Sequence, residues 1–260
     1  MPIIAHLAQA VQLPAMARET QVEGVVLRRW YAGEYDKWVS LLTPECGKFR
    51  VRVRGGRKPK SKMGMLTEPL SHIKARVIEG REQRLLVQPQ LVRSYVNVRL
   101  ELERLTIALA LGETLDRWLP EEHPEPEVYA VLVDALGSLE GGALPAGVAA
   151  SAIWRWLAVL GYAPEVSQCA RCGTAGGDGC VIVGGQLWCA RCAPRGNGVP
   201  LSSRVVECLQ ECLRGELLEA RPDEAQILLR AGLRYAEDAL ESPLRWLEFW
   251  ERLSALRESG

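Results

Sequence analysis

The sequence lacks the motifs on which several protein classes depend. It has three histidines, and neither the HExxH of a metalloprotease nor the full signature of a zinc deaminase is present. A GxxxxGK[ST] phosphate loop and a GxGxxG after a strand are also missing, so we expect no nucleotide-hydrolysis site. Apolar runs such as Val25–Leu27 and Ile107–Leu111 fall far short of the ~20 residues that a membrane span needs. The sequence therefore predicts neither an enzyme of these classes nor a membrane partner.

The beginning of the chain carries no export signal. Residues 1–17 are mildly apolar but lack the basic start and the apolar core of about 7–15 residues that mark a signal peptide. We expect a cytoplasmic protein and assign residues 1–21 to an N-terminal extension. In a reducing compartment, the eight cysteines are expected to be thiols or metal ligands rather than disulfides.

Lysine is absent after Lys74, and the charge changes sign in the same part of the chain. The 260 residues include 32 basic and 32 acidic side chains, so the formal net charge is zero. Residues 1–99 hold 18 Lys and Arg against 8 Asp and Glu, a net charge of +10, whereas residues 100–260 hold 14 against 24, a net charge of −10. This asymmetry indicates a basic binding domain joined to an acidic one.

The pattern between residues 22 and 93 predicts a small β-barrel. Short strand-like segments alternate there with turn residues such as Gly33, Gly47 and Gly80. Several short strands in succession are typical of a barrel. The expected strands are Val22–Trp30, Lys37–Leu42, Gly47–Arg54, Leu70–Ile78 and Arg84–Val92.

Helical periodicity begins near Tyr95. Val98, Leu102, Leu105 and Leu109 recur at helical spacing and predict one amphipathic helix that Pro120 ends, and its apolar surface is extended by Leu111, Leu115 and Trp118. Further helices are expected at Pro126–Leu139, Ala146–Leu160, Ser202–Leu213, Asp223–Leu240 and Pro243–Leu256, with Ser202 and Asp223 as N-caps. The expected domains are a barrel at 22–93, a helical domain in two parts at 94–165 and 199–260, and an inserted module at 166–198.

Two CxxC pairs lie in this insert, Cys169-Ala-Arg-Cys172 and Cys189-Ala-Arg-Cys192, and 16 residues separate them. The spacing is typical of a zinc ribbon, in which a hairpin brings the second pair back to the first. Four thiolates complete a tetrahedron, so we expect one structural zinc ion and no open catalytic position. The other cysteines are not expected to be ligands: Cys180 fits neither pair, Cys208 and Cys212 fit a buried helix face, and Cys46 has no evident partner.

Apolar and basic residues alternate from Lys48 to Arg54, and a flexible Gly55-Gly56 loop with four more cations follows. On a strand, this period of two would send the cations to one outer face. They would repel one another unless anions neutralise them, so we predict a surface for nucleic-acid phosphates, the alternative being a solvated face. The predicted DNA-contacting cations are Lys37, Lys48, Arg50, Arg52, Arg54, Arg57, Lys58, Lys60 and Lys62.

Aromatic residues flank this basic segment and could stack on bases. Tyr31 and Tyr35 lie in a polar loop and are predicted DNA contacts. Trp30 and Trp38 either stack on bases or fill the core of the barrel.

Several segments, taken in order, carry a family resemblance. They are the barrel opening Val22–Leu27, the stretch Asp36–Pro44, the basic segment Gly47–Lys62, and Tyr162–Glu165 just before the cysteine insert. Together, over roughly residues 22–256, they resemble the bacterial recombination mediator family RecO. The resemblance implies an N-terminal OB-fold of five strands, followed by an α-helical domain that carries an inserted four-cysteine zinc module.

The resemblance also implies a function and partners. A member of this family would be a non-enzymatic DNA-repair protein that binds single- and double-stranded DNA and anneals complementary strands. With RecR it would help RecA to load on DNA coated with single-strand-binding protein (SSB), whose C-terminal tail is a further expected partner. The acidic helical domain would bind proteins, and nucleoid association within the cytoplasm is expected.

Two other functions have to be weighed against this one. An RNA-binding protein could use the same barrel face and zinc module, and competition between single-stranded DNA and a structured RNA separates the two. An enzyme with a zinc active site is disfavoured, because four thiolates leave no open coordination position.

Overall fold

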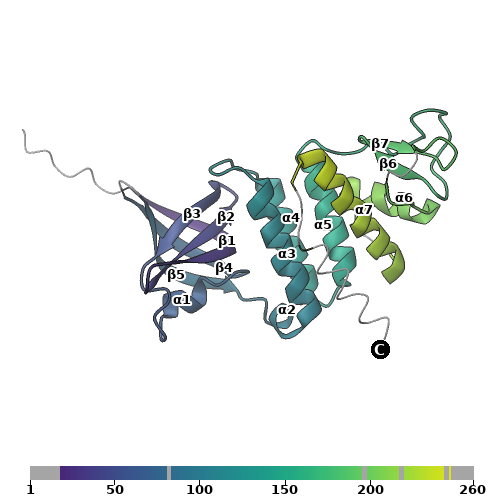
Figure 1. The fold of residues 1–260 in the computed structure, drawn as a ribbon. Helices are drawn as coiled ribbons and strands as arrows, with labels where there is room; N and C mark the ends of the chain where they lie inside the picture. The colour runs from purple at the N-terminus through teal and green to yellow at the C-terminus, as the bar shows by residue number, and fades with distance from the viewer. Residues whose placement is uncertain (1–17, 81–82, 195–197, 217–219, 243–245, 247–260) are drawn as a thin grey trace, which may run out of the picture.

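The computed structural model describes residues 18–80, 83–194, 198–216, 220–242 and 246. Figure 1 shows a barrel at one end, helices side by side in the middle, and a small hairpin with a helix at the other end. The strands are β1 (Glu19–Ala32), β2 (Asp36–Thr43), β3 (Gly47–Val53), β4 (His72–Glu79), β5 (Arg84–Arg93), β6 (Val181–Val183) and β7 (Gln186–Trp188). The helices are α1 (Lys62–Leu66), α2 (Val96–Leu100), α3 (Leu102–Trp118), α4 (Pro126–Glu140), α5 (Pro145–Val159), α6 (Ser203–Leu213) and α7 (Pro222–Leu240).

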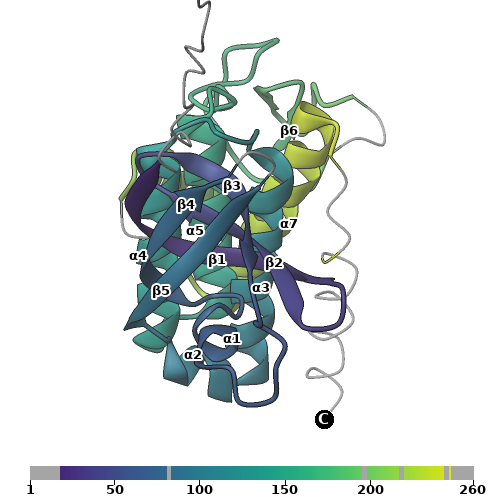
Figure 2. The ribbon, with the colours of Figure 1, turned by 90° about the vertical axis from the view of Figure 1, so that its left-hand side faces the viewer.

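Strands β1 to β5 form a closed barrel in the order β1-β2-β3-β5-β4 (Figure 2). The long strand β1 pairs with β4 through its first half and with β2 through its second half, and a register shift between Val26 and Arg28 separates the halves. Strands β3 and β5 close the barrel in parallel at Arg52 and Leu85. This is the five-stranded barrel that the strand pattern predicts, with the OB-type fold that the resemblance implies, although β1 begins at Glu19, inside the expected N-terminal extension.

The inner and outer faces of the barrel follow the strand period of two. Val39, Phe49, Val51 and Ile73 point inward and are at most 3% exposed. Their neighbours along β2 and β3 point outward, as the alternation in the sequence predicts. The barrel therefore has its own apolar core, separate from the contacts that its outer face makes.

Within the described residues, the helices agree with the prediction except where the first one breaks. Glu101 has an extended backbone and divides the expected helix into α2 and α3. The break changes the phase of the apolar face: Leu102 and Leu109 are 65% and 40% exposed, whereas Ile107, a residue outside the predicted face, is fully buried. The predicted face of this helix is therefore wrong at these two leucines. No helix of the described ranges is long and apolar enough to cross a membrane.

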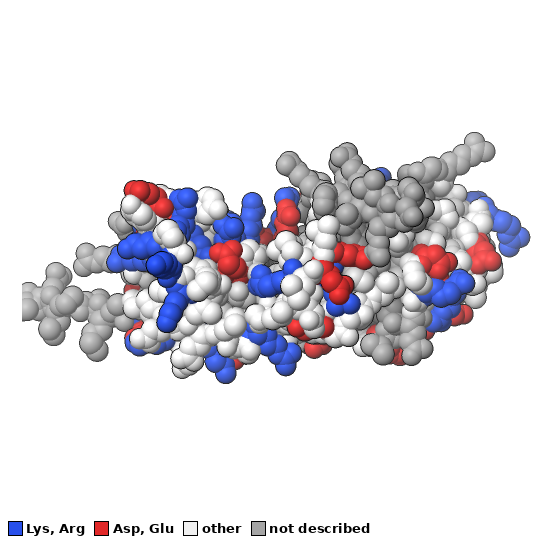
Figure 3. Space-filling model, turned by 90° about the horizontal axis from the view of Figure 1, so that it is seen from below, with Lys and Arg blue, Asp and Glu red and all other residues white. Residues whose placement is uncertain are grey.

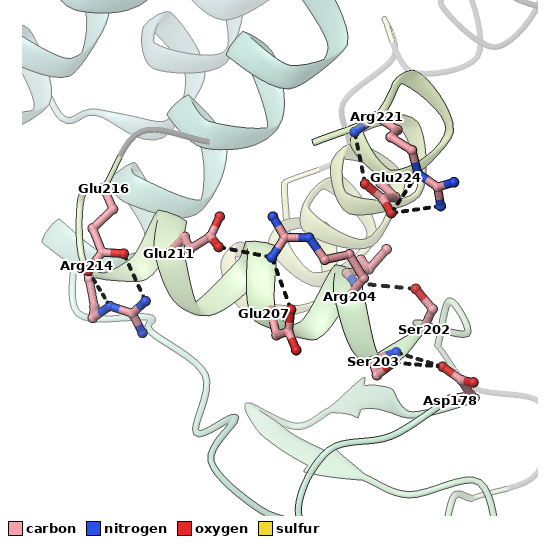
Figure 4. A network of polar contacts seen from close by, with 11 residues as sticks. Asp178, Ser202, Ser203, Arg204, Glu207, Glu211, Arg214, Glu216, Arg221 and Glu224 are labelled. Carbon is pink, nitrogen blue, oxygen red and sulfur yellow. Dashed lines mark hydrogen bonds and ion pairs between the residues drawn. The ribbon is translucent and has the colours of Figure 1, made fainter. Parts of the chain in front are cut away.

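The beginnings of α6 and α7 show two different caps. Ser202 caps α6, as predicted, because its hydroxyl accepts a hydrogen bond from the Val205 N–H. For α7, however, Asp223 is not the cap: Arg221 is, because Pro222 takes the first helical position and Glu224 accepts a hydrogen bond from the Arg221 N–H (Figure 4). The expected helix Pro243–Leu256 lies outside the described residues, apart from Trp246.

The barrel packs directly on α3. Leu27 and Leu42, on the outer face of the barrel, belong to the same apolar cluster as the helices. Gly112 of α3 lies so close to β1 that a Cβ atom there would be 3.3 Å from the carbonyl oxygen of Leu27. The loop after α3 also reaches the barrel, since the Glu122 N–H donates to the Lys48 carbonyl. The end of α3 thus lies against the outer face of the barrel.

His72 lies at this junction and should make stability depend on pH. Its Nε2 atom is 3.0 Å from the Glu23 carboxylate and 3.1 Å from the Tyr129 hydroxyl, and Lys74 and Arg93 lie nearby. Burial lowers the pKa of His72 despite the attraction of Glu23. Its contribution is therefore fully present above the unfolded pKa of about 6.5 and is lost as the pH falls through the lower folded pKa.

We expect His72→Gln to reduce the difference in unfolding free energy between pH 7.5 and pH 5.5, measured by urea denaturation. The amide can still form hydrogen bonds but does not titrate in this range. An unchanged difference would show that His72 does not cause the acid sensitivity.

Candidate nucleic-acid interface and metal centre

The second halves of β1 and β2, together with β3, form a continuous outer surface beside α3. The strand register places Trp30, Trp38 and Arg52 in one row across the three strands. Arg28, Ser40 and Arg50 form the next row toward α3. Trp30 and Trp38 are half-buried on this surface and belong to neither apolar cluster of the described residues, so the alternative that they fill the barrel core is wrong.

The basic loop after β3 is fastened to the turn between β1 and β2. Asp36 accepts hydrogen bonds from the Gly55 N–H at 2.7 Å and from Arg52. The Arg57 N–H donates to the Tyr35 carbonyl at 2.9 Å, and the Arg57 guanidinium donates to the Gly33 carbonyl. These bonds tie the loop that begins at Gly55-Gly56 to the β1–β2 turn, and its flexibility stays a prediction.

This loop and turn present an exposed surface of cations and aromatic rings. Tyr31 is 60% and Tyr35 is 51% exposed. The Arg57 guanidinium lies 4.1 Å from the centre of the Tyr31 ring, and the Lys58 ammonium lies 5.8 Å from that of Tyr35. In Figure 3, Lys and Arg gather over the barrel end of the molecule, whereas both signs mix over the helices. The exposed cations are Arg54, Arg57, Lys58, Lys60 and Lys62.

Lys37, a predicted DNA contact, is only 1% exposed. Its ammonium donates to the Glu68 carboxylate and to the Gly64 carbonyl, both at 2.8 Å. Burial lowers the pKa of Lys37, and Glu68 partly offsets that effect. Lys37 therefore holds α1, which follows the basic loop, instead of facing solvent.

Lys48 also departs from the prediction that it points into solvent. It is 7% exposed, and its ammonium donates to the Asp116 carbonyl in the last turn of α3. A cation at this place donates a hydrogen bond to a carbonyl that has no partner within the helix. It is also stabilised by the negative end of the helix dipole. The period-two pattern is correct for Lys48, but the helical domain covers that end of the strand.

Arg50 and Arg52 point outward as predicted, and both are ion-paired. Arg50 lies 2.7 Å from Glu121, and Arg52 lies 2.7 Å from Asp36. The sequence reasoning missed Arg28, which lies in the same row as Arg50, has a side chain that is 57% exposed and pairs with Asp116 at 3.7 Å. The alternation of side chains along β1 would have shown that Arg28 points outward only if the register shift between Val26 and Arg28 had been known.

The four cysteines of the two CxxC pairs come together in the insert. The sulfur atoms of Cys169, Cys172, Cys189 and Cys192 all lie within 4.8 Å of one another. Those of Cys172 and Cys189 are 3.7 Å apart. Four sulfurs about 2.3 Å from a tetrahedral zinc ion would be about 3.8 Å apart, so this cluster fits zinc binding.

The electrostatics of the cluster favour a bound cation. The backbone N–H groups of Cys189 and Cys172 lower the pKa of the Cys169 thiol to about 6, and Thr174 lowers that of Cys172. In contrast, the neighbouring sulfurs, that of Cys189 first, raise the pKa of Cys192 to about 12. Without a cation, four thiolates at this distance would repel one another, whereas a divalent metal ion would hold all four deprotonated.

The hairpin between the two pairs joins the cluster to the helical core. Strands β6 and β7 pair as predicted, and the Leu187 carbonyl accepts a hydrogen bond from the Ala170 N–H in the first CxxC turn. The Leu187 side chain is fully buried in the apolar cluster of the helices. Asp178 ties the insert to α6 by accepting hydrogen bonds from the N–H and hydroxyl of Ser203 (Figure 4).

The other cysteines lie apart from the metal cluster. Cys180 is buried, and its sulfur accepts a hydrogen bond from the Gly177 N–H. Cys208 and Cys212 are fully buried on the inner face of α6, and burial raises the pKa of both thiols. They act as apolar core residues, as the sequence predicts.

Comparison with known proteins places this arrangement in a family. The model of the C-terminal part of recombination protein O matches residues 99–248, and that of the N-terminal part matches residues 16–95. The chain belongs to the RecO family. DNA repair proteins RecO of Nocardioides sp. and Streptomyces coelicolor are 32% and 34% identical to it, over 88% of this chain and 98% of each relative. That of Frankia casuarinae is 32% identical, over 88% of this chain and 97% of the relative.

As a member of the RecO family, the chain has a role in DNA repair as a recombination mediator. Its partners are DNA and proteins of the recombination pathway. The OB-type barrel, the helical domain and the four-cysteine insert agree with this membership.

Proposed function

We propose that this chain binds single- and double-stranded DNA through its barrel and anneals complementary strands without catalysing a reaction. The observation that carries this proposal is the exposed basic loop, which lies beside the exposed rings of Tyr31 and Tyr35. Such a surface attracts phosphates and does not need to read their sequence.

Annealing requires that two polyanions approach each other. Lys and Arg side chains that neutralise phosphates on both strands reduce the repulsion between them and release counterions. The proposed contacts are Arg54, Arg57, Lys58, Lys60, Lys62, Tyr31 and Tyr35, with Arg50 and Arg52 joining when phosphates displace their carboxylate partners. Lys37 and Lys48 are left out of this set, because both ammonium groups are buried and bonded within the protein.

For the insert, we propose one zinc ion with a structural role. Four sulfur ligands close the coordination shell, so the metal would hold the two CxxC turns together and would offer no position to a substrate. Domain boundaries at residues 22–93, 94–165, 166–198 and 199–260 remain part of the proposal.

The protein partners follow from the family rather than from a contact in the structure. We propose that the acidic helical domain binds proteins, with RecR, the SSB tail and RecA as the partners, and that the chain works at the nucleoid. RNA binding through the same barrel is the second candidate function.

The test is a binding and annealing assay on the purified chain at several salt concentrations. We expect annealing of complementary oligonucleotides to be accelerated and DNA affinity to fall steeply with salt. Unlabelled single-stranded DNA should displace a labelled strand better than a structured RNA of equal length does. No DNA binding at low salt would contradict the proposal, and better competition by the RNA would favour the second function.

A further inference from the structure

Two tryptophans lie next to each other on the outer surface of the barrel. Trp30 and Trp38 are directly opposite in the β1–β2 pairing, and both side chains are half-buried. Neither packs in the barrel core or in the helical core of the described residues. Both indoles are therefore partly exposed on the outer surface of the barrel, where a flat ligand can contact them.

The arginines around these rings are already neutralised by carboxylates. Arg28 pairs with Asp116, Arg50 with Glu121, and Arg52 with Asp36. The exposed loop cations Arg54, Lys58, Lys60 and Lys62, in contrast, form no ion pair within the described ranges. The tryptophan surface is therefore close to neutral, and its attraction for phosphates is weaker than that of the loop.

The two surfaces face different sides of the same strands. Trp30 and Trp38 share the outer face with Arg50, whereas Tyr31 shares the opposite face with Arg29 and the buried Lys37. The tryptophan surface is therefore distinct from the surface that the loop and Tyr31 form.

The tryptophan surface already holds one planar group against a ring. The Arg50 guanidinium lies 5.4 Å from the centre of the Trp30 ring. Ser40, 1% exposed in the row beneath, has a hydroxyl without a hydrogen-bond partner among the described residues. A base could stack in place of the guanidinium, since both are flat and interact with an indole face.

We propose that Trp30 and Trp38 form a stacking site for unpaired bases, which gives the barrel a preference for single-stranded DNA. The inference rests on the proposed DNA binding and adds the source of strand selectivity. Bases in a duplex are stacked on one another and cannot reach the indoles, whereas the loop binds the phosphates of either form.

The experiment compares three fluorescently labelled probes of equal length: a thymidine oligonucleotide, an abasic strand with the same phosphates, and a duplex. The wild-type chain should bind the thymidine strand about tenfold more tightly than the abasic strand. The double variant Trp30→Leu/Trp38→Leu should lose that difference while its affinity for the duplex changes less than about twofold. Leucine keeps an apolar side chain but cannot stack on a base.

The matched control is Trp30→Phe/Trp38→Phe, which retains aromatic rings and should retain most of the preference for the thymidine strand. If the wild-type chain binds the thymidine and abasic strands with equal affinity, that measurement alone overturns the inference. A leucine variant that keeps the full preference would also overturn it. Failure of the proposed DNA binding gives a different result from failure of the stacking site, because the wild-type chain would then bind none of the three probes.

Discussion

Replacing Arg54, Lys58, Lys60 and Lys62 with alanine is expected to weaken DNA binding about 100-fold or more at low salt. All four side chains are exposed and form no ion pair within the described part of the chain. If each contacts one phosphate, the slope of log affinity against log salt concentration should fall by about three to four. Titrations by fluorescence anisotropy at several salt concentrations measure both quantities.

The choice of these four residues follows from the structure. Arg57 is left unchanged because its guanidinium and its N–H both fasten the loop to the β1–β2 turn. Arg50 and Arg52 are left because their ion pairs with Glu121 and Asp36 would also be lost. The variant therefore removes charge with little change in the hydrogen bonds that hold the loop.

A control with the same charge change separates local contact from net charge. Alanine at Arg117, Arg155, Arg214 and Arg234, all in the helical domain, also lowers the charge of the chain by four. We expect this variant to bind DNA within a few-fold of the wild type. An equal loss of affinity in both variants would refute the loop as the phosphate-binding surface.

Cys172→Ser is expected to reduce the metal content from about one zinc ion per chain to near zero. Its sulfur lies within 4.8 Å of the other three, and a hydroxyl is a poor replacement for a thiolate ligand. Because the hairpin packs into the helical core through Leu187, loss of the metal should destabilise that core as well. A loss of about 3 kcal/mol would lower Tm by about 6–12 °C.

Metal analysis and thermal unfolding, each with Cys46→Ser as the matched control, test this expectation. Cys46 is a half-buried thiol outside the cluster, and its substitution should leave the zinc content unchanged. Lowering the pH should release zinc from the wild-type chain, because protons compete for the thiolates. A wild-type chain without zinc, with disulfides within the two CxxC pairs, would refute the proposed metal site.

Features that depend on local sequence could be predicted. The five barrel strands, the hairpin between the two CxxC pairs and the Ser202 cap all follow from short-range patterns that the fold preserves. The four cysteines of the metal cluster follow from their spacing alone. Helix α1 was missed, because it is only five residues long and its Gly64 carbonyl is bonded to Lys37, which is distant in the sequence.

Features that depend on the packing of one domain against another could not be predicted. The alternation from Lys48 to Arg54 shows which residues point outward, but not that the end of α3 covers Lys48. It also gives no sign that carboxylates from the end of α3 and the loop after it pair with Arg28 and Arg50. The sequence therefore overestimated the free positive charge of the strand, while the loop after it kept its charge.

The placement of the barrel at one end of the molecule has a consequence for the approach to DNA (Figure 1). Residues 1–99 carry a net charge of +10 and residues 100–260 a net charge of −10, so the molecule has a large electric dipole along its length. The electric field of a polyanion exerts a torque on this dipole, which turns the barrel toward the DNA before contact. The association rate should thus depend strongly on ionic strength although the molecule as a whole is neutral.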